Sequence, residues 1–282
     1  MPQTINTNLP SLNAQRNLTS SQTSLQISMQ RLSSGLRVNS AKDDAAGLAI
    51  AERMNAQVRG MNVAVRNAND AISLSQTAEG AIGKIGDALQ RMRELAVQSA
   101  NGTNNAGDRG NLQTEFNELQ LEVARLVDGT RFNGTNLFDG SNAMFTFQVG
   151  PGTTVNDTID IAGTDLTANV RDAIGVGVID ISGATAAGAT AAIDALDTAI
   201  DEVTTSRATY GAAQNRFESV VMNLQVSAEN LTAARSRIMD ADYAVETANM
   251  SRSQILQQAG NAMVAQANAL PQMVLQLLRG GG

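Results

Sequence analysis

The strongest hydrophobic pattern in the chain lies in its C-terminal half, over residues 193–238. Apolar residues recur there at alternating spacings of three and four. One of the two heptad positions is apolar at each of its occurrences, which are Leu196, Val203, Tyr210, Phe217, Leu224, Leu231 and Ile238. A repeat of 3.5 residues keeps one stripe of a helix facing a partner helix as the two supercoil. The pattern therefore predicts a coiled-coil helix roughly 70 Å long, at about 1.5 Å per residue.

A matching pattern lies in the N-terminal half. It runs through Ala51, Met54, Val58, Met61, Val65, Ala68 and Ile72, and resumes after a three-residue shift at Ala78, Ile82, Ile85, Leu89, Met92 and Ala96. The Gly- and Asn-rich stretch "ANGTNNAGDRG" then ends this helix. A shorter helix follows, with Leu112, Phe116, Leu119, Val123 and Leu126 on one face. These stripes predict a mainly α fold, an elongated bundle of long coiled-coil helices in which N- and C-terminal segments pair.

The middle of the chain shows a different periodicity. In "MFTFQVGPGTTVNDTIDI", apolar and polar residues alternate on both sides of Gly150–Thr154. Alternation with a period of two, interrupted by Gly and Pro, predicts a β-hairpin. Residues 162–192 are rich in Gly, Ala and Thr, with a possible strand at Val176–Ile181. We expect this segment to form a loop-like tip, since it carries too little apolar sequence for a core of its own.

About 40 residues at each end predict separate helices. Gly35 suits a left-handed helix stop, and Ser40 and Asp240 suit the N-caps of the helices that follow them. The apolar stripes are thin, with Leu18, Leu25, Met29, Leu32 and Leu36 at one end and Val245, Ala248, Ile255, Ala259, Met263, Leu270, Val274 and Leu277 at the other. Such helices are marginal in water without packing. The predicted domains are therefore a terminal helical coiled coil (1–42 plus 240–282) and a rod-like bundle with a hairpin (43–239) that contains the loop 162–192.

Composition removes most chemistry from consideration. The chain has no Cys and no His, so thiol nucleophiles, imidazole bases and most zinc sites are excluded. The net charge of −7 argues against a general nucleic-acid binder, although residues 1–42 hold four basic residues and no acid. That acid-free, Ser-rich stretch would also suit a transit peptide. No apolar run marks a secretory signal or a membrane span. We expect no enzyme, cofactor, metal or membrane insertion.

Two patterns that could suggest chemistry have simpler explanations. The sequence "GAIGKI" at Gly80–Ile85 lacks the spacing and the hydroxyl of a phosphate-binding loop and falls within a helical stripe. The acid pairs Asp43–Asp44 and Asp240/Asp242 stand where helices are expected to begin, where acids are favourable. Neither pattern predicts a catalytic or calcium site.

Several stretches closely resemble one known family. They are "INTNLPSLNAQRNL", "RLSSGLRVNSAKDDAAGLAIAERM", "LQRMRELAVQSANGTN", "RFNGTNLF" and "ARSRIMDADYAVETANMSRSQILQQAGNAMVAQANALPQMVLQLLR". Residues 1–161 and 190–279 resemble bacterial flagellin, the subunit of the flagellar filament. The resemblance implies a D0-like terminal domain, a D1-like rod and, at 162–192, a reduced loop in place of outer domains. It also implies an extracellular filament that propels swimming and export by a type III apparatus without a cleaved signal peptide.

The resemblance also implies partners and site residues. The implied partners are the chain itself as a helical homopolymer, an export chaperone, the filament cap, the hook-junction proteins and an animal flagellin-sensing Toll-like receptor. By position, Arg91, Leu95 and Glu115 would be the central receptor contacts, with Leu95 as an apolar anchor between two charges. The residues expected to be buried by assembly are Leu25, Met29, Leu32, Ile255, Met263, Leu270, Val274 and Leu277.

Three other interpretations compete with a filament subunit. The cytoplasmic rod of a chemoreceptor is similarly rich in heptads, but it would form one continuous hairpin without the Gly/Asn breaks and the β-hairpin. A hook–filament junction protein shares the terminal design and would assemble only as a short ring. An enzyme based on carboxylates would need a cluster around a cleft, which the sequence does not indicate.

Overall fold

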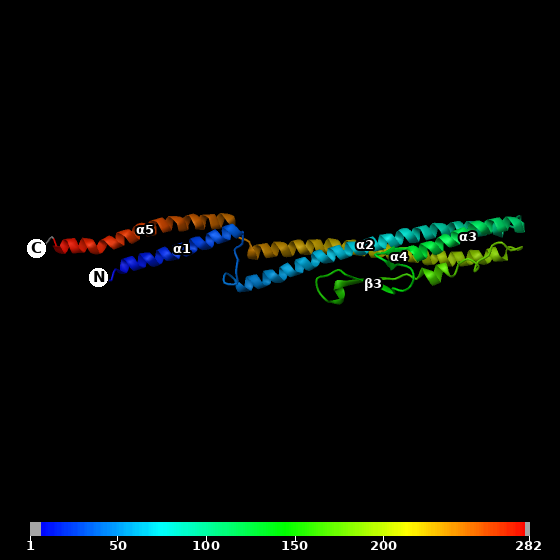
Figure 1. The fold of residues 1–282 in the computed structure, drawn as a ribbon, viewed down its shortest axis with the longest axis horizontal. Coiled ribbons are helices and arrows are strands. Elements are labelled where there is room, and N and C mark those ends of the chain that lie inside the picture. Colours follow the sequence, from blue (N-terminus) through cyan, green and yellow to red (C-terminus); the bar gives the residue numbers. More distant parts are fainter. Residues whose placement is uncertain (1–6, 280–282) are drawn as a thin grey trace. The chain divides into compact units, whose positions relative to one another are not determined.

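The computed structural model describes residues 7–279, except for the side chains of 271–279, and long helices dominate it (Figure 1). The helices are α1 (Leu9–Ser34), α2 (Ala45–Ala100), α3 (Ala106–Gly129), α4 (Ala187–Met239) and α5 (Tyr243–Arg279). The chain divides into a terminal unit, Met1–Ala56 with Asn230–Gly282, and a central unit, Gln57–Glu229. The predicted mainly α fold, with long helices from both halves of the chain paired, is confirmed.

The central unit is held together by the two long stripes that the sequence predicts. Its fully buried side chains include Ile82, Ile85, Leu89 and Met92 of α2, Phe116 and Val123 of α3, and Leu196, Val203, Tyr210 and Phe217 of α4. Each large apolar side chain removed from water contributes about 1.5–3 kcal/mol. Three helices therefore share one core, and the heptad positions of α4 point into it.

Two small hairpins follow α3. In the first, β1 (Arg131–Phe132) pairs with β2 (Thr135–Asn136). Its two turn residues both have positive φ, 48° at Asn133 and 81° at Gly134. Positive φ at both positions is the geometry of the tight hairpin turns for which Asn-Gly is the preferred sequence.

The second hairpin is the one predicted around Gly150–Thr154. Strand β3 (Met144–Gln148) pairs antiparallel with β4 (Thr158–Ala162), and a short 3₁₀ turn, η1 (Val155–Asp157), leads into β4. Phe147 lies opposite Ile159, and its ring meets that of Phe217 edge-on at 5.6 Å. The alternating pattern therefore places one face of the hairpin against α4.

The segment 162–192 differs from the expected tip. The prediction of a strand at Val176–Ile181 is wrong, because only an isolated bridge between Val176 and Ile179 forms there. One turn of π-helix, η2 (Thr167–Arg171), precedes it, and α4 already begins at Ala187. Five large apolar side chains of this segment, Leu166, Val170, Ile174, Ile179 and Ile181, are buried in the core of the central unit, whereas Val176 and Val178 are exposed. The buried residues lack a partner strand and pack instead against the helices.

The helix ends of the terminal unit follow the predicted chemistry but not always the predicted residue. Gly35 ends α1 with φ 70°, as expected. At α2 the cap is Asp44, whose Oδ1 accepts a hydrogen bond from the Gly47 N–H at 2.8 Å. Ser40 is not the cap, because it lies in a separate turn closed by Asp43.

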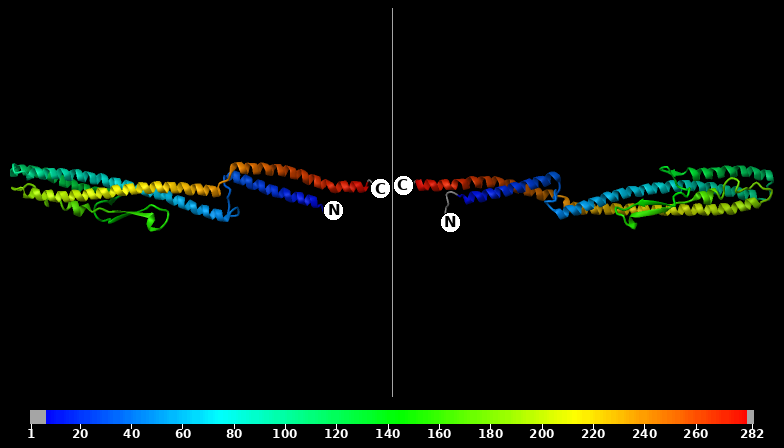
Figure 2. Two further views of the ribbon diagram at one scale, coloured as in Figure 1. Left: turned by 180° about the vertical axis from the view of Figure 1, so that it is seen from behind. Right: turned by 60° about the horizontal axis from the view of Figure 1, so that its bottom comes forward.

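The N-cap of α5 is likewise a different residue from the predicted one. The carboxylate of Asp242 accepts hydrogen bonds from the N–H groups of Ala244 and Val245, at 2.9 and 3.2 Å. The predicted cap, Asp240, instead accepts a hydrogen bond from the Ser236 hydroxyl at the end of α4. Within the terminal unit, α1 and α5 run side by side and antiparallel, as Figures 1 and 2 show.

Candidate assembly and recognition surfaces

The paired terminal helices bury small side chains and leave large ones exposed. On α1 the buried residues are Ser11 and Ser28, and on the described part of α5 they include Ser253 and Ala267. The exposed large apolar side chains of the two helices are Leu9, Leu12, Ile27, Met29, Val245, Ile255, Leu256, Met263 and Leu270. Apolar surface that the pair does not cover is typical of an interaction site.

The residues predicted to be buried by assembly fall into three groups. Leu25 and Leu32 of α1 are half-buried. The exposed ones are Met29, Ile255, Met263 and Leu270, with exposed fractions of 49%, 66%, 58% and 46%. Val274 and Leu277 lie outside the residues whose side chains are described. The described members of the set are therefore half-buried or leave apolar surface exposed.

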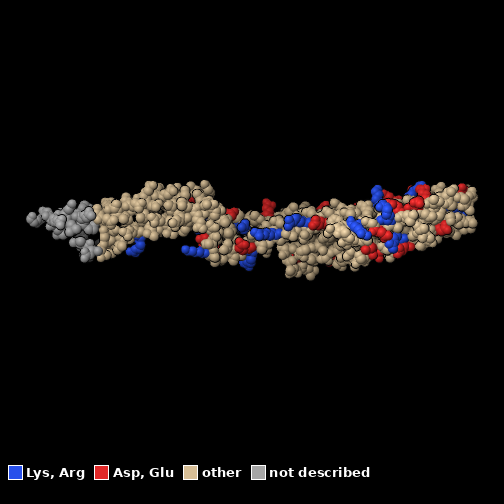
Figure 3. Space-filling view, viewed as in Figure 1, with Lys and Arg blue, Asp and Glu red and all other residues tan. Residues whose placement is uncertain are grey.

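The terminal helices carry very little charge. Helix α1 contains Arg16 and Arg31 and no acid, and α5 contains Arg252, Arg279 and a single acid, Glu246. In the space-filling view the surface over α1 and α5 is almost free of charged atoms (Figure 3). The one acid is buried and binds Arg31, with Nη1 and Oε1 2.9 Å apart. A surface with so few charges can be buried between protein copies with little desolvation cost for ions.

A charged cluster joins α2 and α3 in the central unit. Arg91 donates from Nε and Nη2 to Oε1 of Glu115, at 2.9 and 2.7 Å, and from Nη1 to Glu94 at 2.9 Å. The hydrogen bonds to Glu115 are the main reason that the pKa of Arg91 is raised above its ordinary value. All three side chains are about half exposed or more. Arg91 and Glu115 therefore form one solvent-facing patch.

Leu95 does not belong to that patch. Its side chain is 1% exposed and lies in the core of the central unit. The reason is that this part of α2 is packed by both α3 and α4, so residues on either side of the heptad stripe are buried. Leu95 is therefore not an accessible anchor in this structure.

Sequence reasoning also missed an ion pair between α2 and α4. Arg93 Nε donates to Oδ1 of Asp197 at 2.5 Å, and Nη2 to Oδ2 at 3.3 Å. The hydrogen bond from Arg93 lowers the pKa of the Asp197 carboxyl. The partners are 104 residues apart and neither has a local motif, so no sequence signal indicates the pair.

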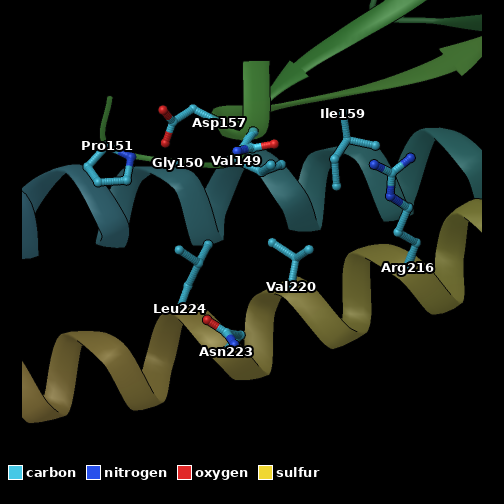
Figure 4. A pocket seen from close by; sticks show the side chains of 10 residues that line it. Val149, Gly150, Pro151, Asp157, Ile159, Arg216, Val220, Asn223 and Leu224 are labelled. Carbon is cyan, nitrogen blue, oxygen red and sulfur yellow. The ribbon is translucent and has the colours of Figure 1, made fainter. Parts of the chain in front are cut away.

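A hollow of about 290 Å³ lies between the hairpin loop and α4 (Figure 4). Its walls combine apolar and polar groups: Val149, Pro151, Val220 and Leu224 with Asn223, Arg216 and Asp157. Among the described residues no three Asp, Glu, His or Cys side chains are grouped so that they could hold a metal ion. Within the same part of the chain, none of the helices combines the length and the hydropathy that a membrane crossing requires. The lining of the hollow is therefore mixed, and it includes no metal-binding group among the described residues.

Comparison with known proteins agrees with this picture. The family model "Bacterial flagellin N-terminal helical region" matches residues 5–143, and "Bacterial flagellin C-terminal helical region" matches residues 193–278. The flagellin of Halalkalibacterium halodurans is 48% identical over 275 residues, which are 98% of this chain and 99% of that protein. The chain belongs to the bacterial flagellin family. This flagellin is a structural subunit of the extracellular flagellar filament that serves motility, and not an enzyme.

Two further matches define how far the similarity extends. The "Flagellar filament 33 kDa core protein" of Treponema phagedenis is 42% identical over 287 residues, 98% of this chain and 99% of that protein. The crystal structure of Bacillus cereus flagellin superposes with a TM-score of 0.50 at 32% identity, covering 60% of this chain and 94% of that one. Full-length matches of this size favour a flagellin over the chemoreceptor rod, the hook–filament junction protein and the carboxylate enzyme.

Proposed function

We propose that α1 and α5 are the assembly element of this filament subunit. In this view residues 1–42 and 240–282 form a D0-like domain, residues 43–239 a D1-like rod, and 162–192 a reduced loop in place of outer domains. The observation that carries the proposal is the combination on α1 and α5 of exposed large apolar side chains with almost no charge. A helix pair of this kind gains most when other copies cover it.

The exposed side chains give the proposal its energetic basis. Met29, Ile255, Met263 and Leu270 each keep about half or more of their surface in water. About half of each side chain is already covered, so burying the remaining half contributes about 1–2 kcal/mol per side chain. Ordering side chains at an interface costs a comparable amount. Assembly is therefore balanced closely enough that one charge placed on this face should prevent it.

A matched pair of substitutions tests the proposal. Ile255→Glu places a carboxylate at an exposed apolar position of α5, and Gln254→Glu places the same charge one residue away at an exposed polar position. We expect Ile255→Glu to abolish filaments in electron micrographs, since a charge would be buried without a partner. Gln254→Glu should polymerise. Equal polymerisation of both variants would remove this face from the assembly contacts.

The Arg91–Glu115 patch suits a second role. From the family resemblance we infer that Arg91 and Glu115 are the contacts with an animal flagellin-sensing Toll-like receptor. What supports this is their position on the surface, where a guanidinium and a carboxylate can make specific, charge-assisted hydrogen bonds. The side chain of Leu95 is buried, so Leu95 would influence receptor binding only indirectly, through the packing of the core.

The receptor proposal has its own control. Arg91→Ala and Glu115→Ala in the depolymerised protein should each lower receptor signalling at least several-fold. Arg125→Ala removes a comparable exposed pair, Arg125 with Glu122 on α3, and should leave signalling unchanged. Leu95→Ala is unsuitable as a test, because truncating a buried Leu costs about 2–5 kcal/mol of stability. Unaltered signalling from both Ala variants at 91 and 115 would contradict the proposal.

The remaining partners are proposed from the resemblance alone. They are an export chaperone, the filament cap and the hook-junction proteins, with export through the type III apparatus. The exposed apolar face of α5 is the surface that a chaperone would cover before assembly. We therefore expect Ile255→Glu to weaken chaperone binding along with polymerisation.

A further inference from the structure

The specific contacts between α1 and α5 are spread along their interface. At one end Arg31 binds Glu246 at 2.9 Å. Near the middle Leu18 lies against Gly260. At the other end Ser11 Oγ donates to Asn268 Oδ1 at 2.7 Å, and Asn8 Nδ2 donates to the Ala267 carbonyl at 2.7 Å. These contacts join two helices whose buried side chains are mostly small, with Leu18, Leu25 and Leu32 half-buried.

The contacts fit one alignment of the two helices. From Arg31 back to Leu18 the chain covers 13 residues of α1, and from Glu246 on to Gly260 it covers 14 residues of α5. From Leu18 to Ser11 it covers 7 residues, and from Gly260 to Asn268 it covers 8. Steps that differ by only one residue on antiparallel helices mean that these contacts belong to one register and are lost together in another.

The ion pair is suited to defining that register and poorly suited to adding stability. Glu246 is 6% exposed, and Arg31 Nε and Glu246 Oε2 have no hydrogen-bond partner among the described residues. A buried pair with unsatisfied atoms adds little stability compared with apolar residues of the same volume. If α1 shifted by one heptad along its length, Glu246 would face Ser24 or Leu25 in place of Arg31. Since α1 and α5 contain no other acid, Arg31 has no alternative partner on either helix.

Gly260 adds a steric contribution to the same choice. A β-carbon at this position would lie 3.1 Å from Leu18 Cδ1 and 3.7 Å from Leu18 Cβ. Gly260 is the one glycine in α5, and α1 has none, so the sequence of the pair provides a single place where the backbone lacks a β-carbon. In a shifted register Leu18 would meet a residue with a side chain.

We propose that Arg31–Glu246 and Leu18–Gly260 select the register in which α1 pairs with α5. A buried polar pair that fixes alignment at some cost in stability is the established use of such residues in coiled coils. The register decides which apolar side chains of α1 and α5 lie together on the outer face. That consequence for filaments rests on the function proposed above, whereas the register itself does not.

The absence of cysteine from the chain allows the register to be measured directly. Leu18→Cys with Gly260→Cys reports the observed register, because the distance of 3.7 Å lies within the usual Cβ separation of a disulfide, about 3.5–4.5 Å. Leu18→Cys with Ala267→Cys, or with Ser253→Cys, reports shifts of one heptad in either direction. Both of these α5 positions are buried. The full-length protein is oxidised under polymerising conditions, and bonds within one chain are separated from dimers by electrophoresis.

Each reporter pair is placed in three backgrounds. One is the parent; the second is Arg31→Met with Glu246→Leu, which replaces the ion pair with apolar residues of similar size; the third is Arg31→Glu with Glu246→Arg, which reverses it. Because Leu18→Cys removes the leucine that lies against Gly260, the disulfide reporters test the contribution of the Arg31–Glu246 ion pair alone. For the steric contact, Gly260→Leu should lower filament yield, and Leu18→Ala should partly restore it.

The expected result is a dominant 18–260 bond in the parent and in the reversed pair. In the apolar background the yield of the 18–267 or 18–253 disulfide should rise at least several-fold. The stability of the chain to urea should be the same as that of the parent or higher, which separates a change of register from a loss of folding. An 18–260 bond that stays dominant in the apolar background, or that fails to form in the parent, would overturn the register proposal. A shifted register with normal filaments would support the register proposal and contradict the assembly function proposed for this face.

Discussion

Gly60 of α2 faces Pro151 of the hairpin loop so closely that a β-carbon at position 60 would lie 2.7 Å from Pro151 Cβ and 3.2 Å from its Cα. This contact brings the loop down onto α2 beside the hollow that α4 borders (Figure 4). The glycine is therefore needed for space, even though glycine in the interior of a helix is unfavourable by about 0.5–1 kcal/mol relative to alanine.

Gly60→Ala should lower the free energy of unfolding by about 1–2 kcal/mol, because the cost of overpacking against Pro151 exceeds the gain in helix propensity. Gly80→Ala is the matched control on the same helix, where nothing lies within 4 Å of the new methyl group. It should raise stability by about 0.5–1 kcal/mol. Urea denaturation followed by circular dichroism measures both. Stabilisation by both substitutions would show that the loop does not rest on α2 as described.

The contact between Phe147 and Phe217 should contribute substantially to the central unit. Phe217 is fully buried and meets Phe147 edge-on. Phe217→Ala should therefore reduce stability by about 3–5 kcal/mol, as is usual for a buried aromatic residue. Met222→Ala, on the same helix but 60% exposed, should change it by about 0.5 kcal/mol or less. Similar losses in the two variants, measured by urea denaturation, would contradict the described core.

The Arg93–Asp197 pair predicts a dependence of stability on pH. The hydrogen bond from Arg93 lowers the folded-state pKa of Asp197 below its unfolded value, which is about 3.9. The stabilisation is therefore fully present above the unfolded pKa and is lost as the pH falls through the folded pKa. Asp197→Asn should be less stable than the parent at pH 6, and the difference should shrink towards pH 3.

The effect should be small, because the pair is exposed and salt screens it. Asp201→Asn serves as the control, since that exposed carboxylate of α4 has no ion-pair partner among the described residues. A stability difference between the parent and Asp197→Asn that stays constant from pH 6 to pH 3 would exclude a contribution from the ionised pair.

How far the sequence predicted the fold depends on the range of the interactions involved. The heptad stripe from Leu196 to Phe217 and the alternation around Phe147 reflect burial on one face of one element, and both were predicted. The N-cap of α2 was misplaced, because Ser40 and Asp44 are both good acceptors and only the path of the chain decides which one begins the helix.

The surfaces were harder to predict, because they depend on how helices are rotated against one another. Leu95 lies beside the stripe of α2 and was expected on the surface, but α2 is packed on two sides there. Arg93–Asp197 and Leu18–Gly260 join residues far apart in the chain and have no local signal. Exposed apolar residues such as Ile255 were predicted correctly as part of a stripe, yet their exposure is known only from the structure.

The central claim is that the apolar face of the terminal helices is open in the free subunit and is covered by other copies in the filament. Ile255→Cys and Met263→Cys place single thiols on that face of a chain that has no other cysteine. The rate of maleimide labelling of each variant should be compared in the soluble protein and in filaments. We predict a fall of at least about tenfold at both positions on polymerisation, whereas labelling rates that are the same in filaments and in soluble protein would contradict the claim.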